Sequence, residues 1–330
     1  MIDFELAFFE TYKRQPTVLE KHNPVKLSAV RMCVPTVQLD EMQKQESEAL
    51  VRFPRIYDAN GHLYYGGDQQ WYPRKTQQMG GCGPVAAVNT LAAYSVGKHA
   101  VLKAFNLPPM VDGKIKKDDY ITLMQDVYKA MGTMELPIAN IAADALHKKG
   151  KTVPAWLTAS FGQQAAGFVY GTLKYALQRG IYLSYRAFPL AYANKEEALR
   201  FIKQSLATGC PVTMLTGWNR HPLRMYKNGP ERPPVALEKG VASHFVNIVG
   251  VQAFGDSIHI LVSTWGQLGI IPYNALYKSW QSPKAAGACL FAFWGSKSKE
   301  LTKKQMHTAY VLLPKLVLST VKKTAQNILA

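Results

Sequence analysis

The residue best placed for covalent chemistry is Cys82, which follows Gly80 and Gly81 and precedes Gly-Pro and an apolar run at 85–94. Pro84 near the first turn and the apolar run predict a helix that begins beside the thiol. A helix N-terminus and a nearby imidazole lower the pKa of a thiol, and the first-turn amides are expected to be free to bind an oxyanion. The glycines, Gly81 in particular, allow a sharp turn and a close approach of substrate backbone. We therefore expect a nucleophilic cysteine.

A general base for this thiol is predicted at His244, the first residue of the β-rich run 244–251. A second β-rich run, 257–264, follows after a segment with the turn chemistry of a hairpin. A cysteine activated by an adjacent imidazole is the arrangement of thiol hydrolases. The hairpin is therefore central to the prediction, because it must carry the base to the helix.

Three segments in this order resemble the papain-like cysteine peptidases, especially the branch that includes the bacteriocin leader peptidases. They are Gln77-Gln78-Met79-Gly80-Gly81-Cys82-Gly83-Pro84, Ser243-His244-Phe245-Val246-Asn247-Ile248-Val249-Gly250 and Ser263-Thr264-Trp265-Gly266. The resemblance covers roughly residues 71–295. It implies that Cys82 is the nucleophile, that His244 is the base and then the acid for the leaving group, and that Gln77 donates to the oxyanion.

Two positions depart from the family pattern. Ser263 stands where the family has an orienting Asn or Asp, and it can accept a hydrogen bond from the imidazole but carries no charge. We expect it to be either the orienting group or an ordinary strand residue. Gln77 lies five residues before Cys82, where papain itself has six, and Gln78 is adjacent; Gln77 is the preferred oxyanion donor. Trp265 is expected to be structural or a wall of the cleft.

The elements around these residues predict an α+β fold. Helices are expected at 119–131, 139–148, 163–178 and 194–206, the last with a capping box of Asn194 and Glu197, and strands at 181–186, 211–215 and 289–294. The resemblance implies a papain-like two-lobe fold, in which a helical lobe with the nucleophile helix packs on an antiparallel β-sheet lobe.

Three domains follow from this pattern. Residues 1–70 are expected to be an N-terminal extension, 71–295 the hydrolase domain and 296–330 a basic helical tail; within the hydrolase domain the helical lobe covers about 71–180 and the β lobe about 181–295. An irregular flap at 218–235 is expected to help set specificity.

Four separate cysteines, without a Cys-x-x-Cys pair or a histidine at ligand spacing, predict no metal site, and we expect no cofactor. Unclustered thiols suit a reducing cytoplasm, although four cysteines also permit two disulfides. Acidic residues at the start argue against a secretory signal, and no apolar stretch reaches the length of a membrane span. The expected location is the cytoplasm, with non-classical export left open.

The formal net charge of +17 arises from scattered lysines and arginines, with small groups at 114–117, 147–151 and 297–304. None of these groups is interleaved with aromatic residues, so nucleic-acid binding is disfavoured. A solvated basic surface or a patch for an anionic partner or membrane surface fits the pattern better.

Three functions remain open on the sequence. The first is a cysteine peptidase that acts on a peptide or isopeptide bond of a peptide or protein substrate through a thioester. The second is an acyltransferase or cyclase on the same fold, in which an amine resolves the thioester. The third is a non-catalytic binding module with a basic partner-binding surface. Ser263 favours this third function, because it carries no charge that could stabilise an imidazolium.

Overall fold

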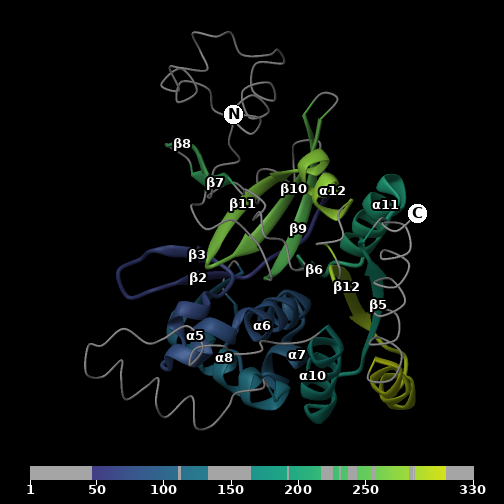
Figure 1. Cartoon of the computed structure of the whole chain (residues 1–330). Helices are drawn as coiled ribbons and strands as arrows, with labels where there is room; N and C mark the ends of the chain where they lie inside the picture. The colour runs from purple at the N-terminus through teal and green to yellow at the C-terminus, as the bar shows by residue number, and fades with distance from the viewer. Residues whose placement is uncertain are drawn as a thin grey trace, which may run out of the picture.

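The structure of the chain is a computed structural model that describes residues 47–110, 113–132, 165–191, 193–216, 226–229, 232–236, 244–254, 257–281, 285 and 287–309. Helices and strands alternate irregularly along these segments, and the strands gather into two sheets. The α+β class that the sequence predicts is confirmed (Figure 1).

The larger sheet holds nine strands within the described segments. Eight of them follow the order β5 (Leu183–Pro189), β12 (Cys289–Gly295), β6 (Val212–Leu215), β9 (Phe245–Phe254), β10 (Ser257–Thr264), β11 (Gln267–Pro272), β7 (Tyr226–Gly229) and β8 (Arg232–Ala236). The ninth, β1 (Ser47–Leu50), pairs with the second half of β9, while β6 pairs with its first half. Neighbouring strands are antiparallel throughout this sheet. The long strand β9 is therefore the strand around which the others assemble.

A smaller sheet lies between the large sheet and the helices (Figure 1). Its order is β3 (Leu63–Tyr65), β2 (Arg55–Tyr57) and β4 (Lys114–Lys116), with β2 antiparallel to β3 and parallel to β4. Ile56 and Ile115 are buried on one face of this sheet and join the core of the helical group.

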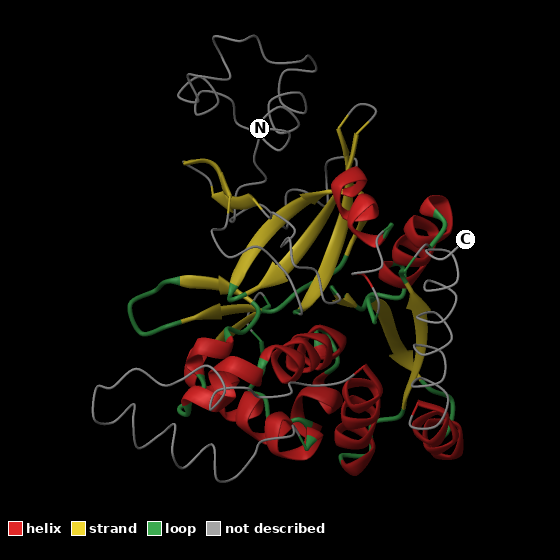
Figure 2. Ribbon diagram, viewed as in Figure 1, coloured by secondary structure: helices red, strands yellow, loops and turns green. Residues whose placement is uncertain are grey.

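Helices gather on one side of the small sheet, as Figure 2 shows. They are α5 (Lys75–Gly80), α6 (Cys82–Ser95), α7 (His99–Ala104), α8 (Lys117–Met131) and α10 (Ala165–Gln178). Two further helices, α11 (Lys195–Leu206) and α12 (Tyr273–Trp280), pack on the large sheet. The buried apolar residues accordingly form two clusters, one among the helices and one between the sheet and α11 and α12.

Most of the predicted elements are confirmed. The helices expected at 119–131, 163–178 and 194–206 correspond to α8, α10 and α11, and the Asn194 side chain accepts a hydrogen bond from the Glu197 amide at 3.1 Å, as the capping box predicts. The hairpin is β9 and β10, in which Ser257 lies opposite Phe254. The helix expected at 139–148 lies outside the described residues. Part of the flap expected at 218–235 is also outside them, and the rest is the strand pair β7 and β8.

Segments on both sides of the predicted hydrolase domain pair with it or pack on it. The second part of the predicted N-terminal extension is built into both sheets, because β1 pairs with β9 and β2 and β3 form the small sheet. The first part of the predicted tail also packs on the fold: helix 299–309 buries Thr302, whose hydroxyl donates to the carbonyl of Leu183 at 3.0 Å. Across the part of the chain that is described, no helix has the length and apolar character needed to cross a bilayer.

Candidate active site

Cys82 is the first residue of α6, as the sequence predicts, and Gly81 is the N-cap. The helix behind it is buried on nearly every side, from Gly83 to Ala93, because it lies between the other helices and β6 and β9. An apolar helix without a polar face is typical of a position inside the protein. The partly exposed Cys82 is therefore held at the end of a rigid, buried element.

The thiol of Cys82 lies against the strand that carries His244. Burial raises the pKa of the thiol above its ordinary value, while the backbone N–H groups of Phe245, Gly83 and Cys82 itself hydrogen-bond to the sulfur and partly oppose that rise. Phe245 directly follows His244, so the sulfur contacts the residue next to the expected base. The sequence expectation of a lowered thiol pKa is wrong, because desolvation outweighs the N–H donors.

The imidazole of His244 is enclosed by the residues that end β10. Its Nε2 lies 2.7 Å from the hydroxyl oxygen of Thr264, and its ring stacks on Trp265 with centroids 4.6 Å apart and an interplanar angle of 21°. The residue is only 7% exposed, and burial lowers the pKa of the imidazole to about 4. At neutral pH the ring is therefore uncharged.

The backbone of His244 is fixed as firmly as its ring. Its N–H donates to the hydroxyl of Thr216 at 3.1 Å, and its carbonyl accepts from the N–H of Thr216 at 3.0 Å. These bonds extend the pairing of β6 with β9 by one residue beyond Phe245 and Leu215. His244 is therefore held at the end of a paired strand, which leaves its backbone little freedom to move.

The partner of the imidazole is Thr264, and the expectation that Ser263 orients it is corrected. Ser263 lies opposite Asn247 in the register of β10 and β9, so both side chains point to the α6 side of the sheet. Neighbouring residues in a strand face opposite ways, and Thr264 therefore lies on the face of the imidazole. The Ser263 hydroxyl instead donates to the carbonyl of Tyr65 at 2.6 Å.

Gln77 and Gln78, the two candidate oxyanion donors, have different surroundings. The amide nitrogen of Gln78 donates to the carbonyls of Tyr72 and Gln70, at 2.8 and 3.3 Å, so it is engaged in local structure. Among the described residues, the buried Oε1 of Gln77 has no hydrogen-bond partner. Gln77 lies in α5, five residues before Cys82. Its Oε1 is an acceptor, whereas an oxyanion needs a donor such as Nε2.

Gly81 and Trp265, the two residues expected to contact substrate, both have structural roles. A Cβ at Gly81 would lie 2.5 Å from the ring of Tyr72 and closer still to the carbonyl of Gln77, so only glycine fits there. Trp265 adopts a positive φ of 49° and stacks on His244, which makes it the wall of the imidazole pocket. That position agrees with the expectation of a structural or cleft-wall residue.

A buried polar network one to two turns below Cys82 joins α6 to β9. The Asn247 side chain donates at 3.1 Å to the carbonyl of Ala86 and to the hydroxyls of Thr90 and Thr213, and it accepts from Asn89 at 2.9 Å. Asn89 accepts in turn from the hydroxyl of Tyr120 at 2.5 Å. Fully satisfied networks of this kind fix one geometry in a core. Here they fix the helix of the thiol against the strand of the base.

The segment around Gly66 passes between this network and the end of β10. The N–H of Gly67 donates to Asn89 at 2.8 Å, and its carbonyl accepts from Gly266 at 3.0 Å. Gly66 has a φ of 73°, and a Cβ there would lie 2.8 Å from the side chains of Asn89 and Ser263. Only glycine lets the chain pass so close to both.

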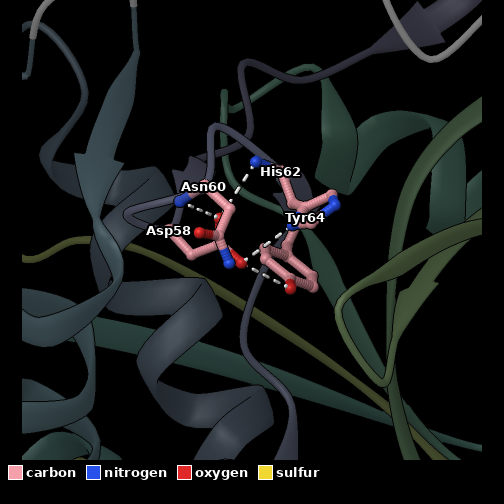
Figure 3. Close-up of polar contacts among 4 residues, drawn as sticks. All are labelled: Asp58, Asn60, His62 and Tyr64. Atoms are coloured by element: carbon pink, nitrogen blue, oxygen red, sulfur yellow. Dashed lines mark hydrogen bonds and ion pairs between the residues drawn. The ribbon is translucent and has the colours of Figure 1, made fainter.

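The hairpin that delivers this segment is closed by Asp58 at its tip (Figure 3). The carboxylate accepts from the amides of Asn60 and His62, at 2.9 and 3.0 Å, from the Tyr64 hydroxyl at 3.0 Å, and lies 3.2 Å from Nδ1 of His62. Desolvation raises the pKa of Asp58, but these donors together bring it below its ordinary value. The Tyr64 ring also packs edge-on against Trp71 beside Gly266, so the hairpin is tied to the end of β10.

Several site residues were missed from the sequence. Thr264 had a signal, because it stands directly between two singled-out residues, Ser263 and Trp265. Asn247 also had one, since it is the only polar side chain in the run Phe245–Val249. The segment 65–67 had no such signal in the sequence, because its place in the site depends on long-range pairing. Among the described residues, no three His, Cys, Asp or Glu side chains gather as a metal site would require.

No protein-family model matches this sequence, and no curated protein shows significant similarity to it. The interpretation of the site therefore depends on its geometry and on the motifs of the chain itself.

Proposed function

We propose that this chain is a papain-like cysteine hydrolase that cleaves peptide or isopeptide bonds of a protein substrate through a thioester. The observation that carries the proposal is the contact of the Cys82 sulfur with the N–H of Phe245, the residue that follows His244. A sulfur at a helix N-terminus beside an oriented imidazole is the arrangement that nucleophilic thiol catalysis requires.

The order of the steps follows from the hydrogen bonds of His244. Its Nε2 lies against the Thr264 hydroxyl, so a proton on Nε2 leaves the lone pair on Nδ1. Nδ1 takes the proton of the Cys82 thiol as the sulfur attacks the carbonyl carbon, and then gives it to the leaving amine as the carbon–nitrogen bond breaks. Water attacks the thioester by the reverse proton transfer and regenerates the thiol.

The negative charge that develops on the carbonyl oxygen needs donors at this place. The first-turn N–H of Cys82 and the side-chain amide of Gln77 are the two candidates. The observation that favours Gln77 over Gln78 is that the amide nitrogen of Gln78 already donates to the carbonyls of Tyr72 and Gln70. A two-lobe papain-like arrangement is part of the proposal, and the two separate apolar clusters support it.

A cytoplasmic location is also part of this proposal. Cys210 and Cys289 are buried free thiols, and Cys82 is free as well. Unpaired thiols are usual in a reducing compartment.

A second candidate is a binding module that keeps the fold without turnover. The observations that favour it are the raised pKa of the Cys82 thiol and the neutral Thr264, which cannot stabilise an imidazolium as a carboxylate would. In that case Cys82→Ser would leave partner binding unchanged, and no product would form from any substrate.

The deciding experiment is product analysis by mass spectrometry after incubation with an unbiased peptide library. Wild type, Cys82→Ala and His244→Gln are compared, with Cys210→Ala as the matched control because Cys210 is a buried thiol outside the site. Hydrolase activity predicts products from wild type and Cys210→Ala alone. Equal products from Cys82→Ala would exclude the thiol as nucleophile, and no product from any of the proteins would favour the binding module.

A further inference from the structure

A groove of about 800 Å³ lies on the small sheet, away from Cys82 and His244. Its walls come from the hairpin of β2 and β3, the edge strand β4, the loop that precedes β4 and the start of α8. They include Tyr57, Leu63, Pro108, Lys114, Lys116 and Asp119. The groove also contains part of the basic group at 114–117, to which the proposed chemistry gives no role.

The register of the small sheet determines which side chains share the groove. Tyr57 pairs with Leu63 on one side and with Lys116 on the other, so these three point to the same face. Lys114 lies two residues before Lys116 on this face, and both lysines are exposed. The opposite face carries the buried Ile56 and Ile115. Strand β4 therefore buries Ile115 and presents Lys114 and Lys116 on the groove face, beside Tyr57 and Leu63.

We propose that this groove binds an acidic, extended segment of a protein partner, with carboxylates at alternate positions. Residues two apart in a strand are about 6.6 Å apart, and an extended peptide has the same repeat. Carboxylates on alternate residues can therefore meet Lys114 and Lys116 together. In such a peptide the residues between the carboxylates point the other way.

The shape and charge of the groove favour a polypeptide over other anionic partners. A concave site cannot lie flat against a bilayer, where binding needs a protruding apolar face. Asp119 also lines the groove, and a carboxylate repels the continuous phosphates of a nucleic acid, whereas it can accept a hydrogen bond from a peptide N–H. Lys114 and Lys116 still outnumber it, so the groove favours an anionic peptide.

The test measures binding by fluorescence anisotropy on full-length Cys82→Ala protein, so that it is independent of catalysis. The probe is a fluorescein-labelled peptide of alternating glutamate and leucine. Lys114→Glu combined with Lys116→Glu is compared with Lys297→Glu combined with Lys299→Glu. The second pair is also exposed, has the same spacing and changes the net charge equally, but lies after β12. A peptide of the same composition, with the two residue types in separate blocks, tests the spacing.

We expect the dissociation constant to rise by about tenfold or more in the groove variant and by less than about twofold in the control variant. The block peptide is expected to bind less tightly than the alternating one. Lys116→Gln alone, with a smaller loss in the same direction, covers the case in which the double variant unfolds. The proposal would be overturned if both double variants bound the peptide equally less tightly. It would also be overturned if the Cys82→Ala protein with both groove lysines intact did not bind the peptide. Tighter, groove-dependent binding of an oligonucleotide or of anionic vesicles would overturn it as well.

Discussion

The Nε2 atom of His244 lies 2.7 Å from the hydroxyl oxygen of Thr264, at the end of the strand that follows it in the hairpin. This bond fixes the imidazole with a neutral group, where a carboxylate would add a stabilising charge. The ring therefore gains orientation without gaining basicity, and burial lowers its pKa to about 4.

Substitutions at Thr264 and at its neighbour Ser263 distinguish which hydroxyl orients the imidazole. Thr264→Val keeps the shape of the side chain but removes the bond to Nε2, and we expect turnover to fall by roughly tenfold or more. Thr264→Ser should restore most of it. Ser263→Ala should keep the turnover of the folded protein and lower the free energy of unfolding by about 1 kcal/mol, since it removes the bond to Tyr65. The same loss of turnover in Ser263→Ala would contradict this assignment.

The pH dependence of alkylation tests the protonation state of Cys82. Because burial raises the pKa of its thiol, modification by iodoacetamide should be slow at pH 7 and rise by about tenfold per pH unit toward alkaline pH. Mass spectrometry of the Cys82 peptide gives the rate, and the buried Cys210, whose pKa is raised to about 11, should stay unmodified. An alkylation rate of Cys82 that does not change with pH down to acid pH would instead show a preformed ion pair between Cys82 and His244.

His244 should make the fold less stable in weak acid. Its pKa is about 4 in the folded protein and about 6.5 in the unfolded chain, so the unfolded chain binds more protons between these values. The free energy of unfolding should therefore fall as the pH is lowered from 7 to 5, by about 2 kcal/mol through this group. Urea denaturation should show that loss in wild type and in the exposed control His99→Gln, but not in His244→Gln. An identical loss in all three would contradict the buried, neutral imidazole.

Disruption of the hydrogen-bond network around Asn247 should lower the free energy of unfolding more than the loss of any other polar contact described above. Asn247→Leu removes its bonds to Ala86, Thr90 and Thr213 and leaves buried polar atoms unpaired, so we expect about 3 kcal/mol lower unfolding free energy. Asn60→Ala, at the exposed hairpin tip, should change stability by less than about 0.5 kcal/mol. A loss below about 1 kcal/mol in Asn247→Leu would show that the network does not hold α6 on β9.

Local sequence patterns located many of the elements and placed Cys82 and His244 at the starts of theirs. Helical spacing located α8 and α10, a capping box located α11, and turn chemistry located the hairpin of β9 and β10. Cys82 at a helix start and His244 at a strand start follow from such local signals. Local patterns determine local structure well because they depend on side-chain period and capping alone.

The parts that the sequence did not reveal depend on strand register and long-range pairing. The distinction between Ser263 and Thr264 is a matter of one residue in the register, which reverses the face that each side chain occupies. The pairing of β1 with β9 and the passage of Gly66 between Asn89 and Ser263 join segments that are far apart in the chain. The raised thiol pKa depends on burial, which outweighs the helix N-terminus and cannot be judged from the residues next to Cys82.

Strand β9 carries the imidazole at its start and Asn247 within it, and this has a consequence for synthesis of the chain. Asn89 and Asn247 are 158 positions apart, so α6 leaves the ribosome long before its partner strand. At ordinary translation speed the delay is roughly 8 to 30 s. During that interval His244 is not yet available to the thiol of Cys82. A nascent chain that ends before β9 should therefore be inert toward its neighbours, and any cleavage activity should begin only after β9 has been synthesised.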